Sequence, residues 1–137
     1  MLDIKFIREN RELVRDAARK KCLANFDLDT LIAADDKRLA LLAEVEGMRA
    51  RQNEASKHIG GMAAGDEAKK MLLSEMKGLK ESLQRQEAAL AVAMKEWQGL
   101  MLQVPNIPDM SVPEGASDAD NKEVKTWGEP AKFDFAA

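Results

Sequence analysis

Basic side chains are concentrated in the middle of the chain, at a density that could neutralise a row of phosphates. Between Arg49 and Lys80 the sequence holds seven Lys or Arg residues and four Asp or Glu residues, a local charge of +3. The whole chain carries −3, so the remainder carries −6. Cationic side chains along a rigid element bind the phosphate backbone of a nucleic acid. The segment therefore predicts nucleic-acid binding, and a solvated Lys-rich helix face is the alternative that the sequence leaves open.

Helical geometry gathers the candidate contacts onto one face. At 100° per residue they fall on a single flank of two predicted antiparallel helices. These candidate RNA-binding residues are Arg49, Asn53, Lys57, Lys69, Lys77 and Lys80. The opposite flank is mixed in charge and contains Arg51, Glu54, Glu67, Glu75 and Arg85. Because the segment lacks aromatic side chains that could stack on unpaired bases, structured RNA is a better candidate ligand than single strands.

No combination of residues is typical of a catalytic or metal site. The sequence has one histidine, His58, and one cysteine, Cys22, and it lacks a P-loop and a GxGxxG motif. We interpret His58 as a solvated helix residue near the tip of the hairpin and Cys22 as a small packing residue. We therefore expect no catalytic residue and no metal ligand in this segment.

The cationic segment lies within two long stretches that have the heptad repeat of a coiled coil. Mostly apolar residues recur at alternating steps of three and four residues, which is the period of a seam between packed helices. The first seam comprises Leu31, Ala34, Arg38, Leu41, Val45, Met48, Gln52, Ala55, Ile59 and Met62. The second comprises Leu72, Met76, Leu79, Leu83, Gln86, Leu90, Ala93, Trp97, Leu100 and Val104. We interpret Gln52 and Gln86 as residues that set the register of the pairing.

A short glycine-rich connection separates the two seams, with Gly60, Gly61 and Gly65. It leaves no room for a parallel return, so the two arms must be antiparallel. We predict a first arm over residues 28–60 and a second over residues 66–104, each about 50 Å long. The second arm ends before Pro105, which cannot continue a helix.

The first 24 residues predict a small helical body at the base of the hairpin. The expected helix-capping residues are Asp3, Asn10, Asp27 or Asp29, and Asp66 with Glu67. The apolar residues of the two short helices need a partner. The nearest apolar cluster along the chain is the base of the hairpin around Trp97, so we expect the stability centre there.

The C-terminal part reads as an extended tail. Residues 105–120 contain three prolines and predict a linker. Weak alternation around Val124 predicts one strand, and Phe133 and Phe135 have no partner that could bury them. The predicted fold class is all-α: a long antiparallel two-helix coiled-coil hairpin with a small N-terminal helical body and an extended C-terminal tail.

Composition fits a long helical protein of the cytoplasm. Aromatic residues make up 4% and charged residues 33% of the 137 residues, which suits helices better than a broad globular core. A single cysteine fits a reducing compartment, and we expect neither a signal peptide nor a transmembrane segment. We expect neither a membrane nor DNA as a partner.

Four stretches of the sequence resemble the bacterial-type seryl-tRNA synthetases over the full length of the chain. They are Met1–Asn10, Leu42–Asn53, Val104–Pro108 with Ser111–Pro113, and Asp120–Asn121 through Trp127–Pro130 to Phe133–Phe135. In that family they correspond to the opening helix, the long N-terminal arm, its exit loop and the entry to the catalytic domain. The last two stretches, in this order and spacing, are the most specific.

The resemblance implies that residues 1–104 are a tRNA-binding helical-hairpin domain and that residues 121–137 begin a truncated catalytic domain. Such an arm lies against the long variable arm and the elbow of tRNA(Ser). The family's enzyme is a homodimer that activates serine with ATP and Mg²⁺ and transfers it to tRNA. Its three class II motifs lie beyond residue 137, so the resemblance implies no cofactor and no activity for this segment alone.

A different class of protein also accommodates the hairpin: a non-enzymatic coiled-coil adaptor or structural protein that binds other proteins. The tail argues against it, because an adaptor has no need of a Trp-Gly-Glu-Pro strand followed by Phe-Asp-Phe. A tRNA-binding assay over a series of salt concentrations distinguishes the two hypotheses.

Overall fold

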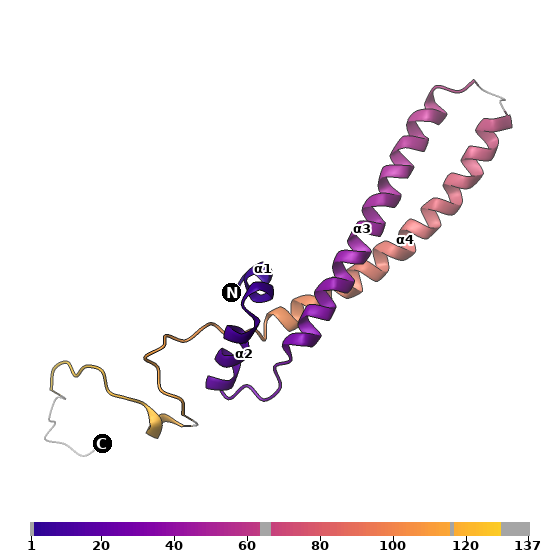
Figure 1. Ribbon diagram of the computed structural model, residues 1–137. Helices are drawn as coiled ribbons and strands as arrows, with labels where there is room; N and C mark the ends of the chain where they lie inside the picture. Colours follow the sequence, from indigo (N-terminus) through magenta and orange to yellow (C-terminus); the bar gives the residue numbers. More distant parts are fainter. Residues whose placement is uncertain (1, 64–66, 116, 130–137) are drawn as a thin grey trace, which may run out of the picture.

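The chain forms a long helical hairpin with a small helical base (Figure 1). The structure, a computed structural model, describes residues 2–63, 67–115 and 117–129. Its helices are α1 (Ile4–Glu9), α2 (Arg11–Lys20), α3 (Leu28–Gly60) and α4 (Glu67–Met101), followed by the 3₁₀ helix η1 (Asp118–Asp120). No strand occurs among these residues. The predicted all-α hairpin is confirmed.

The two arms, α3 and α4, pack against each other through the predicted seams. All twenty seam positions are buried or half-buried, including the polar Arg38, Gln52 and Gln86. Gln86 donates a hydrogen bond from Nε2 to Glu44 on the other arm at 3.0 Å. The heptad spacing thus identifies the contact face of each arm correctly, because that period returns the same helix face every two turns.

The first arm has the predicted bounds, whereas the second arm ends earlier than predicted. At the tip, α3 ends at Gly60, and the backbone N–H of Gly61 closes it onto the carbonyls of His58 and Ile59. The predicted contributions of Gly65 and Asp66 lie outside the described residues. At the base, α4 ends at Met101 rather than at residue 104, and Val104 N–H bonds to the Met101 carbonyl in a tighter turn. A following proline disfavours α-helical geometry in the residue before it, which explains the earlier end.

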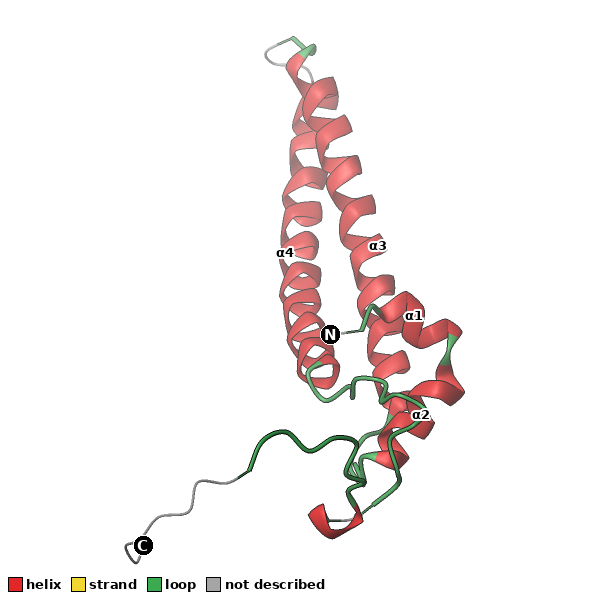
Figure 2. Cartoon of the chain, turned by 90° about the vertical axis from the view of Figure 1, so that its left-hand side faces the viewer, coloured by secondary structure: helices red, strands yellow, loops and turns green. Residues whose placement is uncertain are grey.

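The base of the hairpin is the apolar core. Its cluster of buried residues comprises Ile7, Val14, Leu28, Leu31, Ile32 and Met101. Partly buried side chains pack around it, among them Leu2, Ile4, Phe26, Trp97, Leu100, Val104 and Ile107. Figure 2 shows α1 and α2 beside the lower end of α3. The predicted helical body is therefore confirmed, and it covers the apolar residues at the base of the hairpin, next to the linker.

Capping residues start the helices largely as predicted. The Asp3 carboxylate accepts from Lys5 N–H at the start of α1, and the Asp27 carboxylate accepts from Asp29 N–H and Thr30 N–H at the start of α3. Asn10 occupies the predicted N-cap position of α2, but its side chain makes no capping bond to that helix. Its Nδ2 instead donates to the Phe6 carbonyl at 2.9 Å, which satisfies an end carbonyl of α1.

The linker folds back along α2 rather than leaving the base. Ile107 packs on the core cluster, Pro105 is buried, and Arg19 pairs with Glu114 at 3.7 Å. The predicted strand around Val124 is wrong. Val124 and Trp127 are 92% and 90% exposed, and a strand does not form without a second strand to pair with. Phe133 and Phe135 lie outside the described residues.

No helix among the described residues is long and apolar enough to cross a membrane.

Candidate nucleic-acid interface

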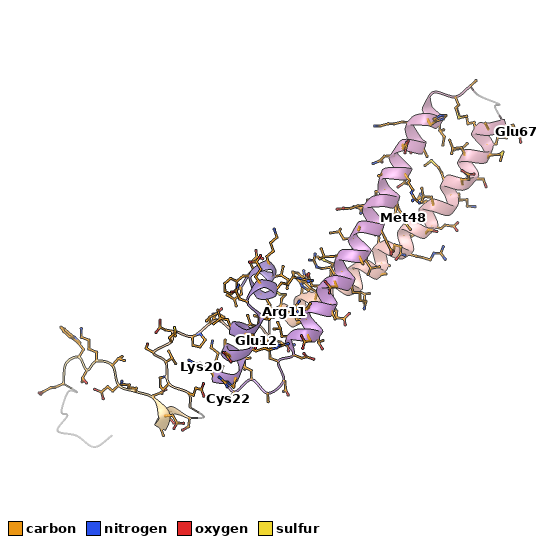
Figure 3. The ribbon with its side chains drawn as sticks, viewed as in Figure 1. Arg11, Glu12, Lys20, Cys22, Met48 and Glu67 are labelled. Carbon is orange, nitrogen blue, oxygen red and sulfur yellow. The ribbon has the colours of Figure 1, made fainter. Side chains whose placement is uncertain are left out.

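The outer half of the hairpin, from the level of Met48 to the start of α4 at Glu67, carries the candidate RNA-binding residues (Figure 3). Asn53 and Lys57 are exposed on α3, and Lys77 and Lys80 are exposed on α4. The remaining two candidates, Arg49 and Lys69, have partners within the protein.

Arg49 forms an ion pair across the two arms. Its Nε and Nη2 donate to Oε1 of Glu87 at 3.0 and 2.7 Å. The two side chains are 60% and 40% exposed, so the pair lies at the surface. Its positive charge is largely offset by the carboxylate, and a phosphate would have to compete with Glu87 for the guanidinium.

The same ion pair establishes which sides of the two arms lie together. Glu87 follows Lys80 by seven residues, so the two occupy the same stripe of α4. Because Arg49 reaches Glu87, Arg49 and Lys80 lie on one flank of the hairpin. Lys77 lies one turn from Lys80, and Asn53 lies one turn from Arg49. The structure therefore brings these candidates to a common flank.

Lys69 forms a hydrogen bond within the protein near the tip of the hairpin. It is half-buried, and its Nζ donates to the Met62 carbonyl at 3.1 Å. It lies seven residues before the seam residue Met76, so it continues the seam instead of the flank. The hydrogen bond joins the start of α4 to the chain just beyond α3.

Three lysines remain as unpaired cations on the flank: Lys57, Lys77 and Lys80. None of them forms an ion pair with any part of the chain that the structure describes. Lys70, also on α4, is bound to Glu67 at 3.0 Å. We define the cationic flank as Asn53, Lys57, Lys77 and Lys80, with three free ammonium groups and one amide that can both donate and accept.

The opposite flank is different in chemistry and in shape. It has a shallow hollow of about 310 Å³ near the tip, lined by Arg51, Glu54, Ala55, His58 and Leu72. Lower down, Lys37 pairs with Glu96 across the arms at 3.2 Å. Cations and carboxylates alternate here, so this flank offers no uniform positive surface.

The other residues considered for chemistry are structural or solvated. His58 is exposed near the tip, as predicted. The interpretation of Cys22 as a packing residue is wrong, because it is exposed. Cys22 adopts a left-handed backbone with φ of 53° just after α2, which turns its thiol towards the linker, where it donates to the Gly115 carbonyl at 3.8 Å. Among the described residues no group of His, Cys, Asp and Glu could hold a metal ion.

Comparison with known families accounts for most of the chain. Residues 1–108 match the family model described as the seryl-tRNA synthetase N-terminal domain. The chain belongs to this family. Both the hairpin and its helical base lie within the matched residues, and the match ends just after the predicted linker begins.

Curated relatives match along nearly the whole chain. The chain is 45% identical to the serine–tRNA ligase of Brachyspira hyodysenteriae over 138 residues, 44% identical to that of Acetivibrio thermocellus and 40% identical to that of Thermomicrobium roseum. Each match covers 98% of this chain but only 30–32% of the relative. The chain thus spans about a third of the length of these proteins.

A solved structure has the same architecture as this N-terminal domain. The crystal structure of seryl-tRNA synthetase from Pyrococcus horikoshii complexed with ATP superposes with a TM-score of 0.72 at 27% sequence identity. The match covers 93% of this chain and 29% of that protein.

Sequence reasoning missed Glu87, which decides how much charge Arg49 presents. A signal was available, because Glu87 lies one heptad after Lys80 and so falls on the predicted RNA-binding flank. The sequence does not predict which residue of the first arm lies opposite Glu87, because this depends on where the chain turns at the tip.

Proposed function

We propose that this chain is the tRNA-binding arm of a seryl-tRNA synthetase and that its cationic flank docks on the long variable arm and elbow of tRNA(Ser). The observation that carries this proposal is a row of cations, Lys57, Lys77 and Lys80, that form no ion pair with the described residues and lie on the outer half of a long hairpin. Ammonium groups without protein partners release counterions when they meet phosphates, and this release drives binding.

The geometry favours recognition of shape. Two packed helices present a nearly straight surface, and the flank has no aromatic side chain that could stack on a base. A rod of this kind can follow a helical RNA arm through its backbone phosphates, with Asn53 adding hydrogen bonds to phosphate or ribose. The long variable arm of tRNA(Ser) supplies such an RNA helix.

The relatives' names, which describe serine–tRNA ligases, support a further proposal about the whole enzyme. We propose that the parent protein is a homodimeric serine–tRNA ligase whose catalytic domain takes ATP and Mg²⁺, while this arm holds no cofactor. The 137-residue chain should then show no serine-dependent exchange of pyrophosphate into ATP. Such exchange by the purified chain would contradict this assignment of roles.

A matched pair of double variants tests the tRNA-binding flank. Lys77→Glu with Lys80→Glu reverses two cations of the cationic flank, and Arg51→Glu with Arg85→Glu reverses two exposed cations elsewhere on the outer hairpin. Both change the net charge by −4, so long-range attraction falls equally. Affinity for a tRNA with a long variable arm is measured by fluorescence anisotropy over a series of salt concentrations.

The first pair should weaken binding much more and should lower the salt slope by about 0.7–0.9 for each lost phosphate contact. Equal losses from both pairs would mean that only bulk charge matters, and a larger loss from the second pair would place the RNA on the opposite flank. If the parent chain binds no tRNA, the proposal fails and the coiled-coil adaptor becomes the better hypothesis.

A further inference from the structure

A buried carboxylate joins three helices at the base of the hairpin. Asp35 of α3 is 1% exposed, which is rare for a charged side chain. Its Oδ2 accepts from Nε and Nη2 of Arg8 at 2.9 and 2.5 Å, and its Oδ1 accepts from Nε and Nη2 of Arg38 at 3.1 and 2.6 Å. Both oxygens are therefore occupied by guanidinium groups.

The two arginines extend this contact to the neighbouring helices. Arg8 belongs to α1 and also donates to Asp36 at 2.6 Å, and its two carboxylate partners raise the pKa of its guanidinium. Arg38 lies over the ring of Trp97 on α4, with its Cζ 4.5 Å from the ring centroid. One carboxylate thus connects α1, α3 and, through Arg38, α4.

Apolar packing alone does not explain how α1 keeps its position. It has only six residues, too few to be stable by itself, and Ile7 is its one buried side chain. Apolar contacts tolerate sliding and rotation because they are not directional, whereas paired guanidinium–carboxylate hydrogen bonds fix both distance and angle. A buried ion pair contributes more to a unique arrangement than to stability in some proteins.

We infer that Asp35 is a positioning residue that fixes α1 on the side of the hairpin, and so sets the direction of the arm relative to the N-terminal helices. The importance of this positioning for tRNA recognition rests on the proposed function, because an arm that presents RNA to a distant catalytic site needs a fixed direction. The positioning itself can be measured without RNA, so its failure is distinguishable from failure of the proposed function.

The test is a distance distribution between two spin labels. They are placed at Lys5→Cys on α1 and Ser56→Cys on the outer part of α3, both exposed, in a chain with Cys22→Ser. Ser56 lies 21 residues after Asp35 on the same helix, which is about 30 Å along the arm. The distance between the labels therefore changes when the direction of α1 relative to the arm changes. Pulsed electron resonance is recorded for this parent and three variants.

Asp35→Asn keeps the shape of the side chain but turns an amide N–H₂ towards one guanidinium. It should at least double the width of the distance distribution. Asp36→Asn removes one charge from an exposed partner of the same Arg8 and should leave the width close to that of the parent. Val14→Ala, in the apolar core on α2, serves as a control for loss of stability. Asp35→Asn and Val14→Ala are each measured at the same number of degrees below their own melting temperature.

Broadening by Asp35→Asn alone supports the inference. An unchanged width in Asp35→Asn would overturn it. Equal broadening in Val14→Ala would also overturn it, because α1 would then be held by the general stability of the base and not by this carboxylate.

Discussion

Arg38 of the first arm lies over the indole ring of Trp97 on the second arm, with its Cζ 4.5 Å from the ring centroid. Both residues occupy seam positions, so a cation and an aromatic ring replace an aliphatic pair at this level of the hairpin. The buried Nε1 of Trp97 has no hydrogen-bond partner among the described residues. Trp97 therefore contributes through its ring, which packs against the base core and faces the guanidinium.

Replacement of this ring should destabilise the whole chain. We expect Trp97→Ala to lower the free energy of unfolding by about 3 kcal/mol, near the low end for a large aromatic residue because Trp97 is half-buried. Chemical denaturation followed by circular dichroism measures this. Trp127→Ala is the control: Trp127 is 90% exposed, so its loss should change stability by no more than about 0.5 kcal/mol. A cost below about 1 kcal/mol for Trp97→Ala would show that the base core does not depend on it.

The ion pair between Arg49 and Glu87 should limit the contribution of Arg49 to RNA binding. We expect Lys80→Ala to lower the salt slope of tRNA binding by about 0.7–0.9, and Arg49→Ala to lower it less. Glu87→Gln should strengthen binding, because it frees the guanidinium. Its control, Glu75→Gln, makes the same change of charge at an exposed position on the opposite flank. If Glu87→Gln were no better than Glu75→Gln, Arg49 would not be part of the interface.

Backbone protection should decrease from the base of the hairpin to its tip. Residues 61–63 follow the last turn of α3, and the N–H groups of Gly61 and Met62 make only short-range bonds at 3.1 and 3.2 Å. Exposed backbone with few buried contacts opens at little cost in free energy. Amide exchange observed by NMR should therefore be faster at residues 61–63 than at residues 90–100. Equal or slower exchange at residues 61–63 would contradict this gradient.

The start of α3 should make stability depend on pH in the acid range. The Thr30 hydroxyl, followed by the backbone N–H groups of Thr30 and Asp29, lowers the pKa of Asp27 below its ordinary value. A lowered folded-state pKa stabilises the protein above the unfolded-state pKa of about 3.9, and this stabilisation is lost as pH falls through the folded-state value. The melting temperature should therefore decrease as the pH is lowered from 6 to 3.

Asp27→Asn keeps a capping oxygen but removes the titrating group, so it should flatten this dependence. Glu46→Gln removes an exposed carboxylate from the middle of α3 and should keep the pH dependence of the parent. An Asp27→Asn chain whose melting temperature still falls with pH as steeply as that of the parent would rule out Asp27 as the source.

The contacts that the sequence did not predict share a physical cause. The sequence indicates the chemistry of Arg49, Lys69 and Cys22 and their position on one helix or turn, but not the partners they bind. Each has a partner that is distant in the chain or depends on a turn: Glu87 lies 38 residues from Arg49, and Gly115 lies 93 residues from Cys22. The strand around Val124 failed for a related reason, because a strand needs a second strand and the described residues provide none.

The sequence by itself determined the two arms, their antiparallel pairing, their seams and the apolar base. These features follow from local rules: a heptad period, a glycine-rich connection and a proline after the second arm. Only the tertiary structure decided which cations stay free and how the base is joined to the arm. The first outcome depends on which residues of the two arms lie opposite each other, and this places Glu87 beside Arg49. The second depends on how α1 packs on α3, where Asp35 binds both Arg8 and Arg38.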